Sequence, residues 1–344
     1  MSNDFSCSLP NTNLSAVSLG HGSGGKLSSN LIAESFLSSL GNSILNDLED
    51  ASIVNNNLAV STDSFVVKPI FFPGGDIGSL SIHGTINDLA MRGAKAQYIA
   101  CGFILEEGFL IADLNKIINS IKEACQQNDI KLIAADTKVV NKGTGDKIFI
   151  TVCGFGQVQH KIIPSVKQAK EGDVVIVSGD IARHGMAIMA LREEFELEST
   201  ITSDTAALYP LVNELLRHNI KINTLRDITR GGLATVLNEI AKASGVSIEI
   251  DEAKVMVHSN VQALCEMLGI DPLYVACEGR FVAIVDQADS KLCLSLMHKH
   301  KLGKDARIIG RVFASKDHQV IAKTAIGGTR LLDTLIYDQL PRIC

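Results

Sequence analysis

The sequence predicts an α+β protein of two domains. Its 344 residues are more than twice the ~150 residues of an average domain. Strand-like and helix-like hydrophobic patterns alternate irregularly in both halves, and a segment bearing Pro, Lys and Gln at 163–173 separates them. We therefore expect four parts: a Gly-rich N-terminal segment at 1–45, an α+β domain at 46–160, a second α+β domain at 161–315, and a C-terminal arm at 316–344.

Composition and charge narrow the class of protein. Apolar residues are 46% and charged residues 20%, which excludes bulk disorder. With 32 Lys and Arg against 38 Asp and Glu, the net charge of −6 disfavours nucleic acid and anionic membranes as partners. No apolar run approaches the ~18 residues of a membrane helix, and Met1–Pro10 lacks the basic and apolar regions of a signal peptide. We expect a cytoplasmic protein.

The eight cysteines predict reduced thiols. No export signal supports disulfides, and no C-x-x-C pair indicates zinc or iron–sulfur ligation. Cys101 and Cys153 lie in the apolar context that is typical of core thiols. Cys344 differs from the others because it is the last residue of the sequence.

Hydrophobic periodicity predicts the elements of the first half. The segment 58–67 has the pattern of a strand, a turn and a second strand. Helices are expected at 76–92 and 111–128, and further strands at 97–105, 130–135 and 147–155.

The second half is expected to begin with a buried strand at 174–178. Helices are expected at 184–194, 205–219, 233–244 and 260–268, and further strands at 246–250, 281–285 and 306–312. In the C-terminal arm, Gly327 and Gly328 predict a hinge, and residues 329–340 carry leucines at helix-like spacing before Pro341.

A Gly-rich stretch at 20–26 is the first motif that points to chemistry. Gly20, Gly22 and Gly25 satisfy G-x-G-x-x-G, but the preceding apolar run is too short for the strand of a dinucleotide-binding fold. Leu27 stands where a P-loop needs Ser or Thr to bind magnesium. What remains is an amide-rich loop with Lys26, able to cover phosphates; the alternative is an ordinary mobile loop.

Three carboxylates are expected at strand ends or turns: Asp63, Asp88 and Asp136. Magnesium bound with a nucleotide needs a few carboxylate oxygens and keeps several waters. Lys138 follows Asp136 by two residues and would supply a charge for phosphate or accept a proton. The set predicts a metal–phosphate site, although each Asp taken alone is more often a turn or cap residue.

Two further segments are candidates for the same site. The run from Asp227 to Glu239 is expected to be a loop feeding a helix, with Thr229 as N-cap and with Gly231 leaving amides open to an anion. Glu278 lies between an apolar run and a Gly turn, where partial desolvation would suit it to proton transfer. The alternatives are a capped structural helix and a surface Glu.

Taken together, these motifs resemble the HypE family of hydrogenase maturation proteins, within the aminoimidazole-ribonucleotide-synthetase-like (PurM-like) ATP-binding superfamily. The resemblance is near full length and ends on Pro-Arg-Ile-Cys, a tetrapeptide specific to that family. Its other segments are 20–25, 62–78, 84–91, 136–140, 183–185 and 227–234. Two positions depart from the pattern: Ala96 replaces a Pro, and Cys277 replaces an Asn.

The resemblance implies the reaction, the cofactors and the partners. A HypF-type carbamoyltransferase would load Cys344 with a thiocarboxamide, which the enzyme, a carbamoyl dehydratase, would dehydrate with ATP and Mg²⁺ to a thiocyanate. The cyano group would pass to iron on a HypC–HypD complex and become a ligand of [NiFe]-hydrogenase. The family fold has two α+β domains, and its N-terminal sheets pair across a homodimer to form a barrel, with the ATP sites near that interface.

The resemblance also assigns roles to residues. Asp63, Asp88 and Asp136 would hold magnesium. The catalytic set would be Cys344, Glu278, Lys138 and Asp88. The nucleotide would contact Gly22, Gly24, Gly25, Lys26, Asp63, Asp88, Gly93, Asp136, Thr137, Lys138, Arg230 and Gly231.

Two alternatives to this function remain open at the level of the sequence. One is another enzyme of the superfamily, a small-molecule kinase or synthetase that acts on a free substrate. The other is a non-catalytic carrier whose terminal cysteine only ferries a group between partners. The first predicts ATP turnover that is independent of Cys344, and the second predicts no nucleotide cleavage by the isolated protein.

Overall fold

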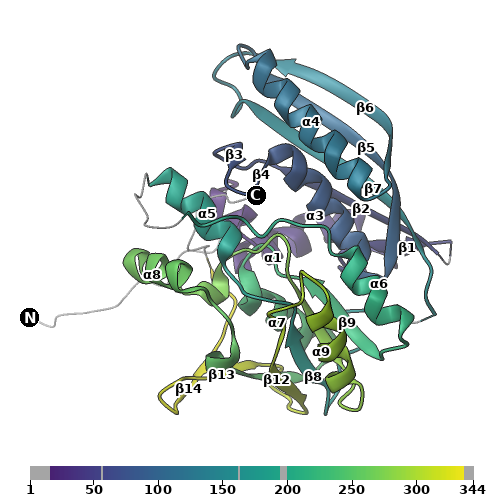
Figure 1. Ribbon diagram of the computed structural model, residues 1–344, viewed down its shortest axis with the longest axis vertical. Helices are drawn as coiled ribbons and strands as arrows, with labels where there is room; N and C mark the ends of the chain where they lie inside the picture. The colour runs from purple at the N-terminus through teal and green to yellow at the C-terminus, as the bar shows by residue number, and fades with distance from the viewer. Residues whose placement is uncertain (1–15, 56, 162, 194–199, 337–344) are drawn as a thin grey trace, which may run out of the picture.

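The computed structural model describes residues 16–55, 57–161, 163–193 and 200–336, and it confirms the predicted fold class (Figure 1). Two α+β domains follow one another along the chain, joined by a segment near 163–173 whose described residues form neither helix nor strand. No helix among the described residues has both the length and the apolarity needed to cross a membrane.

The first domain is built on a five-stranded sheet of order β1-β2-β7-β5-β6. The strands and the short β3–β4 ribbon have these bounds: β1 Ser52–Val54, β2 Leu58–Phe65, β3 Phe71–Phe72, β4 Gly75–Asp76, β5 Ala94–Glu106, β6 Lys131–Val140 and β7 Ile148–Val158. Neighbouring strands are antiparallel except β5 and β6, which are parallel because α4 (Ile111–Gln127) connects them.

Helix α3 (Ile77–Met91) lies between the sheet and the second domain and is apolar around most of its circumference (Figure 1). Twelve of its fifteen residues are buried, as expected for a helix packed on several sides. Asp76 caps its start, since Oδ1 accepts hydrogen bonds from the amides of Gly78 (2.7 Å) and Ser79 (2.9 Å). Gly78 lets α4 approach, because a Cβ there would lie 2.6 Å from the carbonyl oxygen of Ile117.

The two faces of the first sheet differ in solvent exposure. Ala59, Ser61 and Phe65 of β2 alternate toward the helix-covered face and are buried. Thr62 and Ser64 point to the opposite face and are exposed. The edge strand β6 is exposed at nine of its ten residues, several of them apolar. This domain therefore presents an open sheet face and an open edge.

The second domain is a seven-stranded sheet of order β14-β13-β10-β12-β8-β11-β9 with helices on both faces. Its strands are β8 Val174–Val177, β9 Ile222–Asp227, β10 Ser247–Asp251, β11 Phe281–Val285, β12 Arg307–Phe313, β13 Val320–Lys323 and β14 Thr329–Leu331. Its helices are α5 Arg183–Arg192, α6 Tyr209–Arg217, α7 Gly232–Ser244, α8 Ser259–Leu268 and α9 Ser290–Lys299, with 3₁₀ turns η4 Glu252–Lys254 and η5 Pro272–Tyr274.

Alternate residues of β8 and β11 enter two different cores. Val175 and Ile284 pack with α5, α7 and α8, whereas Ile176 and Phe281 pack with α6, α9 and the end of α3. The continuous apolar runs that predicted buried strands are explained by this double coverage.

The N-terminal segment precedes β1. It consists of η1 Leu19–Gly22, α1 Lys26–Leu31, a π-helical stretch η2 Ile32–Leu37, α2 Ser38–Leu40 and η3 Leu45–Asp47.

Most elements lie where hydrophobic periodicity predicts them, but two expectations were wrong and several elements were missed. Residues 58–65 form one continuous strand because all eight pair with β7. Strand β6 continues past Ala135, so Asp136 and Lys138 lie within it. Strand β9, helix α9 and the β13–β14 hairpin were not predicted.

The start of the predicted arm also differs from expectation. Gly327, with φ of +86°, and Gly328 form the turn of the β13–β14 hairpin, where Thr324 N donates to Gly328 O at 2.9 Å. Residues 329–331 are therefore a strand of the second sheet instead of the start of a helix. Residues 337–344, including Cys344, lie outside the described residues.

A buried ion pair ties the end of α3 to the interdomain segment. Glu49 Oε2 lies 2.6 Å from Arg92 Nη1, and both side chains are largely buried. The Glu49 carboxylate also accepts hydrogen bonds from the Ser165 hydroxyl and from the amide of Val166.

We expect Glu49→Ala to lower the free energy of unfolding by about 3–5 kcal/mol, because Arg92 would be left buried without its partner. Urea denaturation followed by circular dichroism measures this change, since the chain has no Trp. Asp47→Ala is the control: Asp47 pairs with Lys167 at the surface, where an ion pair contributes ~0–1 kcal/mol. Equal effects of the two substitutions would contradict the structural role of Glu49.

Candidate active site

A polar pocket of about 200 Å³ lies between the first sheet, α3 and the second domain. The residues that line it come from the segment before β1, from β2, α3 and the end of β9, from the loop before α7 and from the segment before β11. The lining residues are Asp50, Thr62, Asp63, Gly84, Asp88, Arg226, Asp227, Thr229, Arg230 and Glu278. Five carboxyl groups thus meet two guanidinium groups.

Three carboxylates form the centre of this pocket. One oxygen each from Asp50, Asp88 and Asp227 lies within 4.8 Å of the others. Asp88 is further held by a hydrogen bond from the Ser61 hydroxyl of β2. Arg226 balances part of the charge, since its Nε lies 3.0 Å from Asp50 Oδ1, but its Nη2 is shared with Glu239 outside the pocket.

The electrostatics of the pocket favour uptake of positive charge. Burial raises the pKa of Asp88 well above its ordinary value, and the carboxylates of Asp227, Asp50 and Asp63 raise it further. Burial likewise raises the pKa of Asp227 and, against the opposing effect of Arg226, raises that of Asp50 to about 6. These groups resist ionisation first because burial removes them from water, and second because each adds negative charge to the same small volume.

The donor set fits a hard divalent cation. Carboxylate oxygens on a rigid frame of helix and strand ends are the ligands that magnesium prefers, and a cation would remove the mutual repulsion that raises these pKa values. Asp50, Asp88 and Asp227, with Asp63 beside them, are the residues that would hold it.

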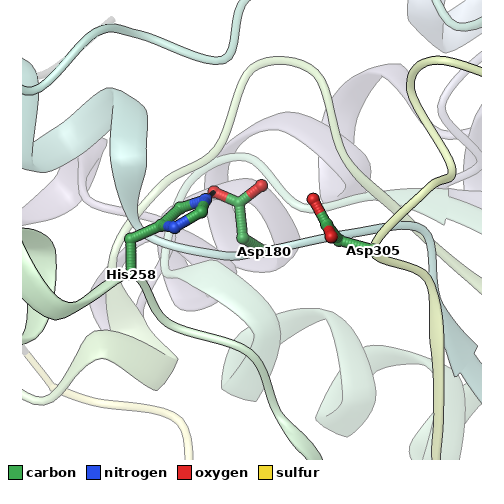
Figure 2. Close-up of side chains that lie close together, drawn as sticks. All are labelled: Asp180, His258 and Asp305. Atoms are coloured by element: carbon green, nitrogen blue, oxygen red, sulfur yellow. Dashed lines mark ion pairs between the residues drawn. The ribbon is translucent and has the colours of Figure 1, made fainter.

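A second group of potential metal ligands lies in the C-terminal domain. Figure 2 shows Asp180, His258 and Asp305 side by side, with ligand atoms within 4.8 Å of one another. Asp180 is already paired with two arginines, Arg183 Nε and Arg280 Nη2, each at 2.6 Å. Burial alone would raise the pKa of Asp180, but these guanidinium groups outweigh it and lower the pKa. This group therefore fits an ion-pair network better than a cation site.

The predicted site residues Asp63, Asp88, Arg230 and Glu278 are brought together in the pocket. Asp88 lies on the inner face of α3 and not at a strand end or turn, and Asp63 lies within β2. Glu278 is 3% exposed, so the alternative of a surface Glu was wrong. Its amide donates to Asp204 Oδ1 at 3.2 Å.

Asp136, Thr137 and Lys138 do not reach this pocket. They lie on the exposed edge strand β6, and Asp136 pairs with Lys138 at 2.6 Å. Asp63 and Asp136 occupy adjacent rows of one sheet, separated by β7 and β5. Three strand spacings of ~4.8 Å place them about 14 Å apart, so the two cannot ligate one ion within a single chain.

The glycines of the predicted site have different surroundings. Gly24 packs against Arg230, since a Cβ at Gly24 would lie 3.0 Å from Arg230 Cβ. A Cβ at Gly22 would have no neighbouring atom within 4 Å. Gly231, with φ of +74°, is the N-cap of α7, so the prediction of Thr229 as N-cap was wrong. Gly93, with φ of +69°, follows α3 and does not line the pocket.

Sequence reasoning missed three charged groups of the pocket. Asp227 is the first residue of the predicted loop at 227–239, but no role was predicted for its carboxylate. Its position at the end of a buried strand is the signal that could have identified it. Arg226 directly precedes it. No sequence motif or hydrophobic periodicity marks Asp50, because it enters the pocket from an irregular segment before β1.

The cysteines of the described part of the chain are free thiols. Cys277 is fully buried and its sulfur accepts a hydrogen bond from the amide of Ala182 at 3.2 Å. Burial raises its pKa well above the ordinary value, so Cys277 is a packing residue next to Glu278.

Two family models match the chain. The AIR synthase related protein N-terminal domain matches residues 48–158, and the C-terminal domain of the same family matches residues 170–323. A thiamine monophosphate kinase from Aquifex aeolicus shares this fold with a TM-score of 0.65 at 18% identity, over 90% of this chain and 99% of that one. The chain thus has the architecture of the AIR synthase related proteins.

More similar relatives include several proteins named carbamoyl dehydratase HypE. Carbamoyl dehydratase HypE of Cupriavidus necator is 47% identical over 95% of both chains, and that of Escherichia coli is 40% identical over 95% of this chain and 99% of its own. A crystal structure of a HypE–HypF complex has a TM-score of 0.86 at 46% identity, over 89% of this chain and 99% of that one. The hydrogenase maturation protein HypE in complex with ATP has a TM-score of 0.81 at 41% identity, covering 96% and 100%.

The chain belongs to the HypE family of carbamoyl dehydratases, which are hydrogenase maturation proteins. The family, the fold and the enzyme class predicted from the motifs are confirmed at this level.

We expect the carboxylate pocket to make stability depend on pH and on divalent cations. A carboxyl group whose folded pKa exceeds its unfolded value stabilises the fold at low pH, and this contribution is lost as pH rises. For Asp50 the loss begins near 3.8 and is complete above about 6, and Asp88 and Asp227 act in the same direction. Millimolar Mg²⁺ should therefore raise Tm more at pH 7.5 than at pH 5.

Thermal melts with and without Mg²⁺ across this pH range measure the effect. Asp50→Asn should flatten the pH dependence and weaken the Mg²⁺ response, whereas Asp129→Asn, at an exposed acid outside the pocket, should leave both unchanged. A Mg²⁺ response that is the same at both pH values would contradict the assignment of the metal pocket.

Proposed function

We propose that this chain is an ATP-dependent dehydratase whose substrate is a thiocarboxamide on its own Cys344. The observation that carries the proposal is the pocket around α3, where buried carboxylates with raised pKa values meet Arg230 and the Gly-rich loop. Such a pocket suits a metal-bound phosphate better than an apolar substrate. Membership in the HypE family supplies the reaction class, and a relative of known structure binds ATP.

The proposed reaction replaces a poor leaving group with a good one. The carbonyl oxygen of Cys344–S–C(=O)–NH₂ attacks the γ-phosphorus of ATP, and ADP leaves. The nitrogen loses one of its two protons, which the departing phosphate later takes up. The C–O bond of the phosphorylated intermediate then breaks, phosphate departs with the electron pair, and the remaining N–H proton is lost. The products are Cys344–S–C≡N, ADP, phosphate and a proton.

The residues of the pocket have matching roles in this proposal. Asp63 and Asp88, with Asp50 and Asp227, would hold Mg²⁺, which neutralises charge on the phosphate oxygens when bound. Glu278 is buried beside them and would orient the thiocarboxamide or accept its proton.

The nucleotide would be bound from two sides. The N-terminal segment at 1–45 would cover the phosphates through Gly22, Gly24, Gly25 and Lys26 and exclude water, which would hydrolyse the activated intermediate. Arg230 and Gly231 would contact it from the start of α7, and Gly93 would shape the turn after the helix that carries Asp88.

A homodimer is part of the proposal, and two observations support it. The pocket of about 200 Å³ is smaller than the ~300–1,000 Å³ of typical ligand sites. Asp136, Thr137 and Lys138 lie on the exposed strand β6, outside the pocket of their own chain. We propose that two first-domain sheets pair through their open faces, so that these residues serve the pocket of the partner subunit as metal, phosphate and proton-handling groups.

The proposed partners are the proteins that would load the carbamoyl group onto Cys344 and receive the cyano group from it. A relative of known structure forms a complex with HypF, and we propose that a HypF-type carbamoyltransferase loads Cys344 here. The thiocyanate would pass its cyano group to iron on a HypC–HypD complex, to become a ligand of [NiFe]-hydrogenase. We place these steps in the cytoplasm.

Intact mass spectrometry tests the reaction. Carbamoylated protein should lose the mass of one water upon addition of ATP and Mg²⁺, and ADP and phosphate should appear in equal amounts. Cys344→Ala should abolish loading and leave nucleotide binding near that of the parent. ATP turnover on a free substrate by Cys344→Ala would favour a small-molecule kinase or synthetase, and transfer without nucleotide cleavage would favour a carrier.

Mixed dimers test the shared site. Lys138→Ala and Asp88→Asn should each be inactive alone, but a mixed dimer contains one pocket with intact Asp88 facing a partner with intact Lys138. Equal mixing after reversible dissociation should restore about one quarter of the parental activity, because half of the dimers are mixed and each has one working site. Asp88→Asn mixed with a Lys138→Ala, Asp88→Asn double variant should restore none and is the matched control. No recovery in the first mixture would place Lys138 in its own chain's site.

A further inference from the structure

Glu278 lies in an irregular segment, residues 276–280, that leads into β11. This segment is neither helix nor strand, so the main-chain groups of Glu278 need hydrogen-bond partners from other parts of the chain. The residue is 3% exposed, which leaves water little access to these groups. The place of the Glu278 side chain in the pocket therefore depends on the groups that bind its amide and its carbonyl oxygen.

Two buried polar side chains hold these main-chain groups. The amide of Glu278 donates to Asp204 Oδ1 at 3.2 Å, and Asp204 is 5% exposed. The carbonyl oxygen of Glu278 accepts a hydrogen bond from Asn87 Nδ2 at 3.3 Å, and Asn87 is 2% exposed. Neither Asn87 nor Asp204 lines the pocket itself. We name these two residues the Glu278 clamp, because they hold the residue from both of its ends.

Asn87 also fixes the segment that carries Asp204. Its Nδ2 donates to Ala206 O at 3.0 Å, and its Oδ1 accepts a hydrogen bond from the amide of Leu208 at 2.8 Å. A Cβ at Gly279 would clash with the carbonyl oxygen of Asp204, so glycine at this position lets the two segments lie in contact. The two members of the clamp therefore form one connected unit.

The clamp joins Glu278 to the helix that carries the central pocket carboxylate. Asn87 directly precedes Asp88 on α3. A Cβ at Gly84, also on α3, would lie 3.8 Å from Glu278 Oε2. Gly84 and Asp88 are four residues apart and lie about one helical turn from each other on the same face. Helix α3 thus carries a carboxylate of the proposed metal site and also anchors the acid that faces it.

We propose that Asn87 and Asp204 are positioning residues, which fix the Glu278 carboxylate relative to Asp88 so that it meets the NH₂ group of the thiocarboxamide. The proposal rests on the proposed function, because it takes Glu278 as the group that orients the thiocarboxamide or accepts its proton. The clamp acts through Glu278 and touches neither nucleotide nor substrate. Because a displacement of about 1 Å can slow a reaction about a hundredfold, the clamp should affect the rate of dehydration more than the affinity for nucleotide.

Single-turnover dehydration by the full-length protein tests the clamp. Carbamoylation of Cys344 is first verified by intact mass, and the rate of water loss is then followed at saturating ATP and Mg²⁺. Asp204→Ala and Asn87→Ala should each slow this rate about ten- to a hundredfold, whereas the dissociation constant of a non-hydrolysable ATP analogue should change by less than about twofold.

Asp204→Asn is the conservative variant that separates positioning from charge. Asp204 Oδ2 is buried and has no hydrogen-bond partner within the described part of the chain, so the one hydrogen bond that matters to Glu278 is accepted by Oδ1. An asparagine keeps that acceptor and removes the charge. Asp204→Asn should therefore dehydrate Cys344 near the parental rate.

Asp173→Ala and Asn223→Ala are the matched controls. Asp173 and Asn223 are also buried, are joined by a hydrogen bond of 2.7 Å in the second domain, and do not line the pocket. Each control should lower Tm, as the clamp variants do, and leave the dehydration rate near that of the parent. If thermal melts show that one alanine variant of the clamp is unfolded, the other one decides.

Three results would overturn the clamp while the mass shift of the parent still supports the proposed function. Clamp variants that dehydrate as fast as the controls would mean a purely structural role. An Asp204→Asn rate as low as that of Asp204→Ala would mean that charge matters and not the acceptor. A loss of analogue affinity as large as the loss of rate would mean that the pair shapes the nucleotide site.

Two further results separate the clamp from the premises on which it rests. A parental rate in Glu278→Gln would overturn the role of Glu278 and the clamp with it, although dehydration itself would stand. A carbamoylated parent that loses no water with ATP and Mg²⁺ would overturn the proposed function and the clamp together.

Discussion

Burial of helix α3 between the two domains is the constraint on which the rest of the structure depends. The helix is apolar on nearly every side, and its residues enter both hydrophobic cores. The first sheet covers one side, and α6 and β9 of the second domain lie against another. Asp88 is carried on this helix, so packing of the domains forces a carboxylate into the interior, where β9 and the segment before β1 add two more.

This arrangement explains why the pocket is polar although apolar packing builds it. Carboxylates that are held together at low solvent exposure cost free energy unless a cation or protons neutralise them. Arg226 and Arg230 compensate in part, and the remaining negative charge would suit a divalent cation. Crowding these carboxylates lowers the stability of the fold, and a protein selected for stability alone would carry fewer charges there. The cluster is therefore typical of a site organised for binding.

Predictability from the sequence differed between elements for physical reasons. Helix α4 was predicted to within one residue at each end, because it is amphipathic and one face is buried while the other is solvated. The C-terminal leucines were assigned to a helix by their spacing, but Leu332 is buried behind β14 by tertiary contacts. Asp63, Asp88, Arg230 and Glu278 were found as site residues from motifs, whereas Asp50 was missed because an irregular segment carries it and no periodicity marks it.

The sequence by itself determined the family, the two-domain α+β class and four of the residues that line the pocket, because these depend on local pattern and on motifs that a linear chain displays. Only the tertiary structure decided which charges meet. It placed Asp50 and Asp227 beside Asp88, separated Asp136 from Asp63 by two intervening strands, and joined Lys26 to Asp333 across most of the chain. Strand order and domain packing set these distances, because both depend on contacts between segments that lie far apart in the sequence.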